Sequence, residues 1–252
     1  MSDRITYVGH ATTLLELGGV RLLTDPLLRT RFVHIPRHAA PPEASVADGV
    51  EAVLITHLHA DHLDPPSLRW LGRDVRLVVP AGAAGTLRRR GFANLTELAP
   101  GDSTAIGPLE VTAIRAVHDA RRYKLGRDLP ALGYLIESPA ARVFFAGDTD
   151  LFDEMAELAG VDVALLPVAG WGARVGRGHL DPKRATEAAR RIRPRIVIPI
   201  HWGTFLSRRM LRSHPEMLTE PPRKFARLLA ERVPGVELRL LEPGESLELA
   251  PS

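Results

Sequence analysis

Four side chains that bind metal ions well occur within one short stretch of the chain, His57-Leu58-His59-Ala60-Asp61-His62. Imidazole and carboxylate groups are ligands that suit zinc, manganese and iron. The stretch directly follows Val53–Thr56, an apolar run typical of a short buried strand. Because side chains alternate along extended backbone, His57 and His59 are expected on the same side. A turn after them can aim Asp61 and His62 at a neighbouring position, so one segment can serve two metal ions.

The chain around this stretch has the pattern of one layered α/β domain over residues 1–252. A hairpin is expected at Gly18-Gly19, between strands Thr13–Leu17 and Val20–Leu23. Asp64-Pro65 and Asp181-Pro182 are typical of the N-cap and first position of helices. Apolar strands covered by helices on at least one face are therefore predicted. The principal helices are expected at Ala83–Arg90, Leu151–Leu158, Pro182–Ile192 and Pro222–Arg232.

Composition sets limits on the class of protein. Apolar residues make up 45% of the chain and charged residues 25%, as in an ordinary globular domain. The sequence contains no cysteine, which excludes disulfides, thiolate ligands and a cysteine nucleophile. No apolar run is long enough for a transmembrane helix and no signal-peptide core is evident, so a cytoplasmic location is expected. The net charge is only +3, and no nucleic-acid partner is expected.

The segment His57–His62 resembles the HxHxDH signature of the metallo-β-lactamase superfamily, and further markers follow in the order that superfamily shows. These are His118, Asp148 in Gly147-Asp148-Thr149-Asp150, and His201 in the stretch from Pro199 to Phe205. The resemblance implies a four-layer αβ/βα sandwich. Within the superfamily, the chain looks similar to the ascorbate-6-phosphate lactonases and the N-acyl-phosphatidylethanolamine phospholipase D-like hydrolases. The residues behind that narrower resemblance include Gly9-His10-Ala11-Thr12, Thr24-Asp25-Pro26 and Glu220-Pro221-Pro222.

The resemblance also implies a set of ligands and supporting residues. One metal ion would be held by His57, His59 and His118, the other by Asp61, His62 and His201, with Asp148 bridging. Asp25 would orient a metal-bound histidine, although a simple turn aspartate before Pro26 is an equal alternative. His10 is expected at the floor of the site or in a structural role. The candidate catalytic residues are Asp61 and His179, and the candidate substrate-binding residues are Arg121, Arg122 and Trp171.

The predicted function is hydrolysis by a water molecule activated between two divalent cations, with zinc expected first and manganese or iron as alternatives. The substrate is expected to be a small anionic ester, lactone or phosphodiester. A metal-containing binding or regulatory protein of the same fold is the alternative function. Oxygen-reducing di-iron relatives replace the second histidine of the motif by glutamate and usually carry a flavin domain, so His59 and the short chain argue against that class. A nuclease of this superfamily would usually carry a large inserted domain.

The segment Leu206–Thr219 separates the His201 motif from Glu220-Pro221-Pro222. It mixes apolar side chains with Arg208, Arg209 and Arg212. This pattern fits an amphipathic flap over the site, a contact between subunits of a homo-oligomer, or a plain surface helix.

Overall fold

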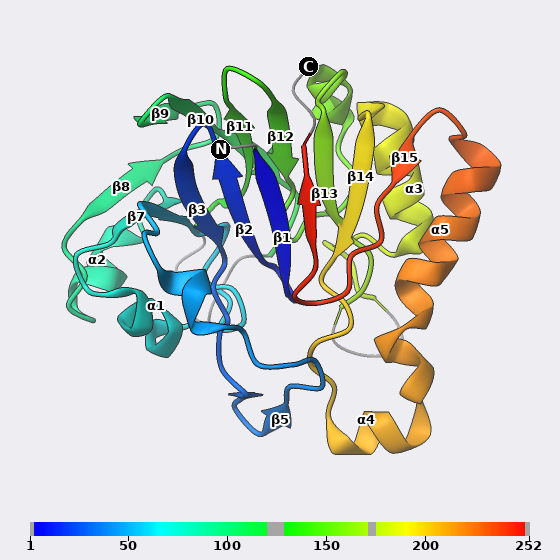
Figure 1. The fold of residues 1–252 in the computed structure, drawn as a ribbon, viewed down its shortest axis with the longest axis horizontal. Helices are drawn as coiled ribbons and strands as arrows, with labels where there is room; N and C mark the ends of the chain where they lie inside the picture. The colour runs from blue at the N-terminus through cyan, green and yellow to red at the C-terminus, as the bar shows by residue number, and fades with distance from the viewer. Residues whose placement is uncertain (1–2, 120–128, 171–174, 250–252) are drawn as a thin grey trace.

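The computed structural model describes residues 3–119, 129–170 and 175–249. Within these ranges the chain forms two large mixed β-sheets that face each other, with helices on their outer sides (Figure 1). The first sheet has the strand order β16 (Ser246–Glu248), β1 (Arg4–Gly9), β2 (Thr12–Leu17), β3 (Val20–Thr24), β6 (Ala52–Leu54), β7 (Arg76–Pro80), β8 (Leu95–Leu98). The second has the order β15 (Glu237–Leu238), β14 (Ile196–Ile200), β13 (Val163–Pro167), β12 (Arg142–Phe145), β11 (Ala131–Glu137), β10 (Leu109–Ala116), β9 (Ser103–Ile106).

Each sheet combines an antiparallel half with a parallel half. Strands β1, β2 and β3 pair antiparallel, whereas β3, β6, β7 and β8 pair parallel. In the second sheet, β9 to β12 pair antiparallel and β12 to β15 pair parallel. The loops after parallel strands emerge at one edge of a sheet, which is where α/β proteins place functional groups.

Helices cover the outer face of each sheet. On the first sheet these are α1 (Pro65–Leu71) and α2 (Ala84–Arg88), and on the second α3 (Pro182–Ile192) and α5 (Glu220–Arg232). The helix–sheet–sheet–helix order confirms the expected sandwich. Smaller elements are the two-stranded β4 (Arg31–Phe32) and β5 (Ile35–Pro36), helix α4 (Arg208–Ser213), and the 3₁₀ helices η1 (Ala44–Ala47), η2 (Asp153–Leu158) and η3 (Pro215–Leu218). None of the described helices has the length and apolarity needed to cross a membrane.

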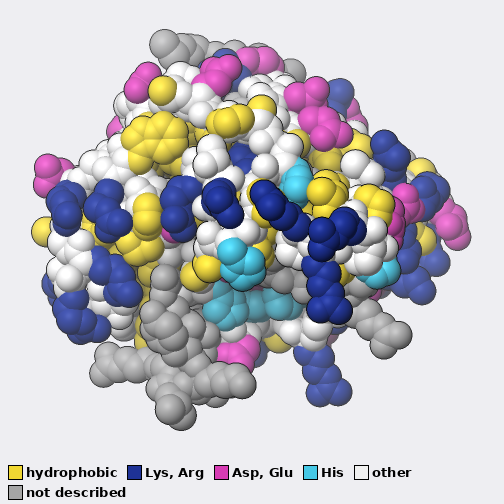
Figure 2. Space-filling model, turned by 90° about the horizontal axis from the view of Figure 1, so that it is seen from below, with side chains coloured by type: hydrophobic (Ala, Val, Ile, Leu, Met, Phe, Trp, Pro, Cys, Tyr) yellow, Lys and Arg dark blue, Asp and Glu magenta, His cyan; other side chains and the backbone are white. Residues whose placement is uncertain are grey.

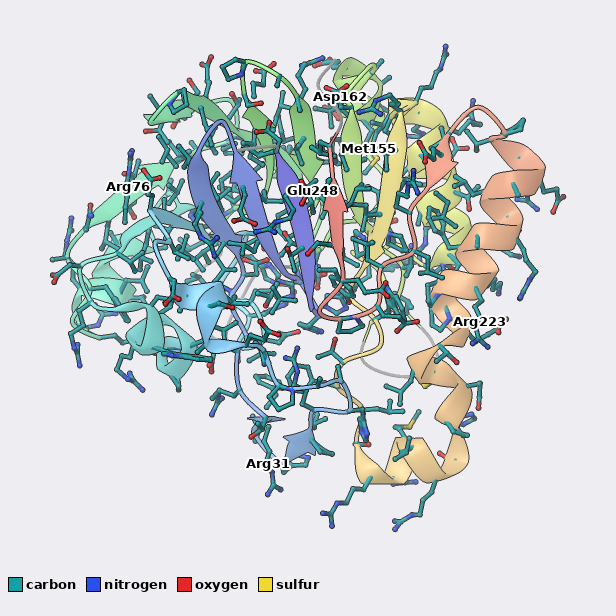
Figure 3. All side chains as sticks on the ribbon, in the orientation of Figure 1. Arg31, Arg76, Met155, Asp162, Arg223 and Glu248 are labelled. Carbon is teal, nitrogen blue, oxygen red and sulfur yellow. The ribbon has the colours of Figure 1, made fainter. Side chains whose placement is uncertain are left out.

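Two apolar cores explain why the strands of the first sheet read as continuous apolar runs. Alternate residues of β2 separate, with Leu15 and Leu17 in the core between the sheets and Leu14 in the core beneath α1 and α2. On β6, Leu54 faces inward and Val53 faces the helices. Both faces of the sheet are therefore buried, as in other sheets covered by helices. Charged side chains lie at the periphery, where Arg31 and Arg223 are exposed (Figure 3).

The predicted starts of two helices are confirmed. The Asp64 carboxylate accepts a hydrogen bond from the Ser67 amide at the start of α1, and Asp181 accepts one from the Arg184 amide at the start of α3. The predicted α-helix over Leu151–Leu158 is wrong in type, because residues Asp153–Leu158 form a 3₁₀ helix. Its buried side chains, Met155 and Leu158, are three residues apart. The three-residue turn of a 3₁₀ helix places both on one side.

Candidate metal centre

The seven predicted ligands all follow the ends of strands. The segment His57–His62 lies after β6, His118 after β10, Asp148 after β12 and His201 after β14. Two facing sheets thus supply loops to one place, and the structure brings side chains from positions far apart in the sequence into groups of close neighbours. The sequence order of the markers had predicted this convergence.

The first group contains His57, His59 and His118. The ring centroids lie 4.6 Å apart for His57 and His59, 4.6 Å for His57 and His118, and 4.8 Å for His59 and His118. His118 Nε2 lies 3.0 Å from His59 Nδ1. Ligand nitrogens about 2.0–2.1 Å from a tetrahedral zinc ion lie roughly 3.3 Å from each other. The 3.0 Å between His118 and His59 is close to that spacing, and the ligand atoms of all three residues lie within 4.8 Å of one another.

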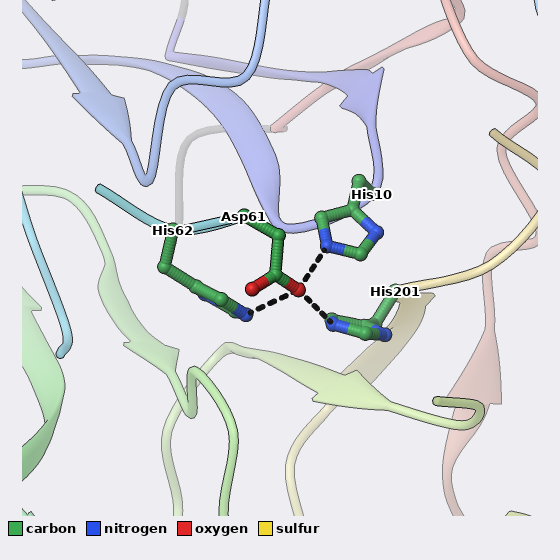
Figure 4. A group of neighbouring side chains, drawn as sticks. All are labelled: His10, Asp61, His62 and His201. Carbon is green, nitrogen blue, oxygen red and sulfur yellow. Dashed lines mark hydrogen bonds and ion pairs between the residues drawn. The ribbon is translucent and has the colours of Figure 1, made fainter. Parts of the chain in front are cut away.

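The second group contains Asp61, His62 and His201, and His10 joins it (Figure 4). Asp61 Oδ2 lies 3.6 Å from His62 Nε2 and 3.9 Å from His201 Nε2. The same oxygen lies 3.0 Å from His10 Nε2. The His10 ring also packs on His201, with centroids 3.9 Å apart. His10 therefore lies inside this group and contacts two of its predicted ligands.

Asp148 lies between the two groups. Its Oδ2 is 3.3 Å from His62 Nε2, and its Oδ1 is 3.5 Å from His201 Nε2. Asp148 also forms a compact set with His57 and His62, one from each group. A carboxylate in this position can offer an oxygen to each of two cations, and the bridging role of Asp148 stays a prediction.

The chemistry of the donors fits a metal centre. Four predicted ligand atoms are buried without a hydrogen-bond partner among the described residues: His57 Nε2, His62 Nε2, His201 Nε2 and Asp148 Oδ1. An unpartnered buried polar atom costs about 1–3 kcal/mol. Bound cations would give all four atoms a partner. The residues present therefore fit divalent cations held by nitrogen and oxygen ligands.

A hydrogen-bonded chain fixes which ring nitrogens are available. Asp25 accepts from the Thr56 amide at 2.8 Å, the Thr56 hydroxyl at 2.6 Å and His62 Nδ1 at 2.7 Å. Since the Thr56 hydroxyl donates to Asp25, its oxygen accepts from His57 Nδ1, 3.0 Å away. Both histidines therefore hold a proton on Nδ1 and turn Nε2 toward the site. Asp25 lies where the predicted orienting carboxylate should be.

Burial and nearby carboxylates control the protonation of the histidines at the site. It lowers the pKa of His201 to about 3 and the pKa of His118 to about 4, and it lowers the pKa of His57 well below its ordinary value. These rings are neutral near pH 7 and can act as ligands. Burial would lower the pKa of His62 too, but the carboxylates of Asp148, Asp61 and Asp25 together raise it well above the ordinary value. A positive charge is thus favoured at the centre of the site.

The predicted catalytic residue His179 lies beside Asp148, at the edge of the first group. His179 Nε2 lies 3.4 Å from Asp148 Oδ2, and its ring lies 4.6 Å from that of His118. Arg121, Arg122 and Trp171 lie outside the described residues. The segment Leu206–Thr219 contributes α4 and η3, and its Leu206, Met217 and Leu218 line a recess together with His10 and His201. This segment therefore adjoins the second group.

Two contributors were not anticipated from the sequence. Thr56 links His57 to Asp25, and the Gly178 carbonyl accepts a hydrogen bond of 2.7 Å from His118 Nδ1. The position of Thr56, directly before His57 at the end of a buried strand, was a usable signal. A backbone carbonyl such as that of Gly178 leaves no signal in residue type.

A sandwich of two facing sheets with a buried histidine and aspartate cluster at the strand ends defines the metallo-β-lactamase class of fold. Residues 20–202 match the model of the β-lactamase superfamily domain, and the chain belongs to that superfamily. Over 251 residues it is 33% identical to a UPF0173 metal-dependent hydrolase from Methanopyrus kandleri, a match covering 97% of this chain and 99% of the relative. The chain is a metal-dependent hydrolase of this superfamily.

Solved structures share the fold. Igni18, a metallo hydrolase from Ignicoccus hospitalis, has a TM-score of 0.74 at 23% identity, over 99% of each chain. CmlA, a diiron β-hydroxylase from Streptomyces venezuelae, has a TM-score of 0.77 at 21% identity, over 98% of this chain and 54% of that one. At these identities the likeness shows the fold alone, and the fold accommodates more than one chemistry. The narrower resemblance to the lactonase and phospholipase D-like branch stays a prediction.

Proposed function

We propose that this hydrolase works with two divalent cations. His57, His59 and His118 would hold one, Asp61, His62 and His201 the other, and Asp148 would contact both. The observation that carries the proposal is the set of buried, unpartnered ligand atoms on both sides of Asp148. One cation would leave part of this set without a partner. Zinc suits the mixed imidazole and carboxylate donors best, and manganese or iron are the alternatives.

Two bound cations supply Lewis-acid activation of a water molecule and stabilise negative charge that develops on the substrate. The chain's own residues prepare the site for this chemistry. Asp25 and Thr56 hold the rings of His62 and His57 with Nε2 turned inward. His10 holds Asp61 through the 3.0 Å contact to Oδ2. No serine or cysteine nucleophile is needed.

His179 is the candidate proton donor to the leaving group. Its side chain is 25% exposed, whereas the side chains of Asp148 and His62 are 4% and 0% exposed. His179 thus stands on the solvent side of the centre, where a leaving group would depart. A histidine in hydrogen-bond reach of the leaving atom can act as a general acid.

The proposed substrate is a small anionic ester, lactone or phosphodiester. Arginine and lysine side chains flank the histidine side chains on the face seen in Figure 2, and a positive surface attracts anions. The exposed arginines of α4, Arg208, Arg209 and Arg212, extend from the segment that adjoins the second group.

A panel of substrates tests this proposal. Purified protein is stripped of metal, reloaded with zinc or with manganese, and supplied with lactones, aryl esters and phosphodiesters. We expect turnover of at least one class with two equivalents of metal and none in the stripped protein. Metal-loaded protein that turns over none of these classes would overturn the proposed substrates, and the metal-containing binding or regulatory protein would then be favoured.

A further inference from the structure

Thr149 and Asp150, directly after Asp148, bind the loop that carries His118. The Val117 amide donates to the Thr149 hydroxyl at 2.9 Å, and the Asp150 amide donates to the Val117 carbonyl at 2.9 Å. The residue before His118 is therefore held through both of its backbone polar groups. These bonds join the loop after β10 to the loop after β12.

The Asp150 side chain extends the connection to a third loop. Its Oδ2 accepts from the Gly178 amide at 3.1 Å and from Arg184 Nη1 at 2.8 Å. Its Oδ1 accepts from the Leu151 amide at 2.9 Å and from Arg184 at 3.0 Å. Arg184 belongs to the first turn of α3, so the carboxylate also ties the loop before α3 to the start of that helix.

Gly178 is bonded to one histidine of the site and precedes another in the chain. Its carbonyl accepts the His118 Nδ1 proton at 2.7 Å, which leaves His118 Nε2 available as a ligand. The next residue is His179, which faces Asp148. Gly178 has a φ of +80°, and a Cβ there would lie 3.3 Å from His118 Nδ1. A side chain at this position would therefore be strained by the positive φ and would press on His118.

We propose that Asp150 is a positioning residue that sets His118 and His179 together through the Gly178 backbone. This inference rests on the proposed function, because it assumes a cation at His57, His59 and His118. Asp61, His62 and His201 lie on the loops after β6 and β14, whereas the Asp150 carboxylate bonds to the loop that carries Gly178 and to Arg184. Loss of the Asp150 carboxylate is therefore expected to weaken one cation site and spare the other.

The test compares D150A with D153A. Asp153 is a matched control because its side chain is fully exposed, at 102%, and its ion pair with Arg191 lies outside the site. Cobalt(II) is titrated into each stripped protein and followed by its visible absorption. We expect wild type to show two binding steps, and D153A to show the same two steps with the same affinities as wild type. D150A should keep one step and weaken the other by about 10- to 100-fold, as is usual when a partner of a metal-bound histidine is lost.

Hydrogen exchange of the metal-free proteins supplies an independent readout. Residues 175–180 should exchange faster in D150A than in wild type and D153A, because the Gly178 amide has lost its acceptor. Two unchanged cobalt affinities together with unchanged exchange would overturn the inference. If wild type itself binds no cobalt, the proposed function fails, and the exchange measurement alone decides whether Asp150 holds this loop.

Further variants keep the inference testable if D150A does not fold. R184M leaves Asp150 in place but removes its charged partner, and G178A pushes a methyl group toward His118. Both should weaken the same single cobalt step, R184M less than G178A. Unchanged cobalt binding in both variants would contradict the proposal.

Discussion

Asp25 Oδ2 lies 2.7 Å from His62 Nδ1, with both side chains fully buried, and the same carboxylate binds the amide and the hydroxyl of Thr56. This carboxylate therefore orients two predicted ligands, one from each group. In D25N an amide that itself carries N–H donors replaces an acceptor of three hydrogen bonds. We expect metal affinity to fall by about 10- to 100-fold.

Isothermal titration of stripped D25N with zinc checks this prediction. T56V is the companion variant, since it removes the hydroxyl and keeps the amide bond to Asp25. A smaller loss of affinity is expected for T56V than for D25N. Affinity equal to wild type in D25N would show that Asp25 is only a turn residue before Pro26.

Gly147 offers a prediction about stability, because it places Asp148 through a close backbone approach. It has a φ of +59°, and an added Cβ would lie 2.6 Å from Thr56 Cγ2. G147A should lower the free energy of unfolding by about 3 kcal/mol or more, since left-handed strain and a steric clash add together. G160A is the control, with a φ of +81° and no atom within 4 Å of the added Cβ.

Urea denaturation of both variants measures the difference. G160A carries the backbone strain alone and should lose about 1–2 kcal/mol. An equal decrease in the free energy of unfolding in the two variants would mean that the close contact between Gly147 and Thr56 does not add to the cost of the substitution.

His179 should affect turnover more than metal binding. H179Q removes the candidate proton donor, and kcat should fall by about 100-fold or more on a substrate with a poor leaving group. On an activated aryl ester, whose leaving group needs no proton, the loss should be much smaller. The metal content should stay as in wild type. H214Q, at an exposed histidine bonded to Glu216, should behave as wild type on both substrates.

Steady-state kinetics on the two substrates with these variants provides the check. A loss of kcat that is equal for both leaving groups would rule out proton donation by His179. Loss of bound metal in H179Q would instead assign His179 to the ligand set.

The residues of the site that could be predicted from the sequence are those whose side chains are themselves metal ligands. His57–His62 is a local signal, because four ligand side chains are adjacent and end one strand. His118, Asp148 and His201 were predicted by their order, and the structure brings each of them to that segment. The hairpin at Gly18-Gly19 and the helix caps at Asp64 and Asp181 likewise followed from turn and capping patterns. The sandwich of two sheets was implied by the resemblance.

The rest depended on contacts that residue type does not encode. The Gly178 carbonyl and the Thr56 hydroxyl act through backbone position and a single rotamer. The small β4–β5 hairpin has two residues in each strand, and its Phe32 packs against Phe205, with ring centroids 6.4 Å apart. Tertiary contacts of this kind decide the local structure where propensity is weak.

Metal removal should destabilise the folded protein. The buried ligand atoms stay without partners in the stripped protein, and carboxylates converge on His62. Cations that bind only the native state add about 2.7 kcal/mol to the free energy of unfolding at a free concentration of about 100 Kd. A thermal melt with chelator and with zinc measures the shift. A melting temperature that does not respond to zinc would mean that the folded protein does not bind it.

The proposed pair of cations can be checked by counting the metal ions bound per chain. Elemental analysis of wild type and D148A, each reconstituted with zinc and freed of excess, gives this number. We expect about two zinc ions per chain in wild type, the content of a dinuclear hydrolase. We expect fewer than one zinc ion per chain in D148A, because the carboxylate between the groups is gone. One zinc ion or less in wild type, or two in D148A, would contradict the proposal.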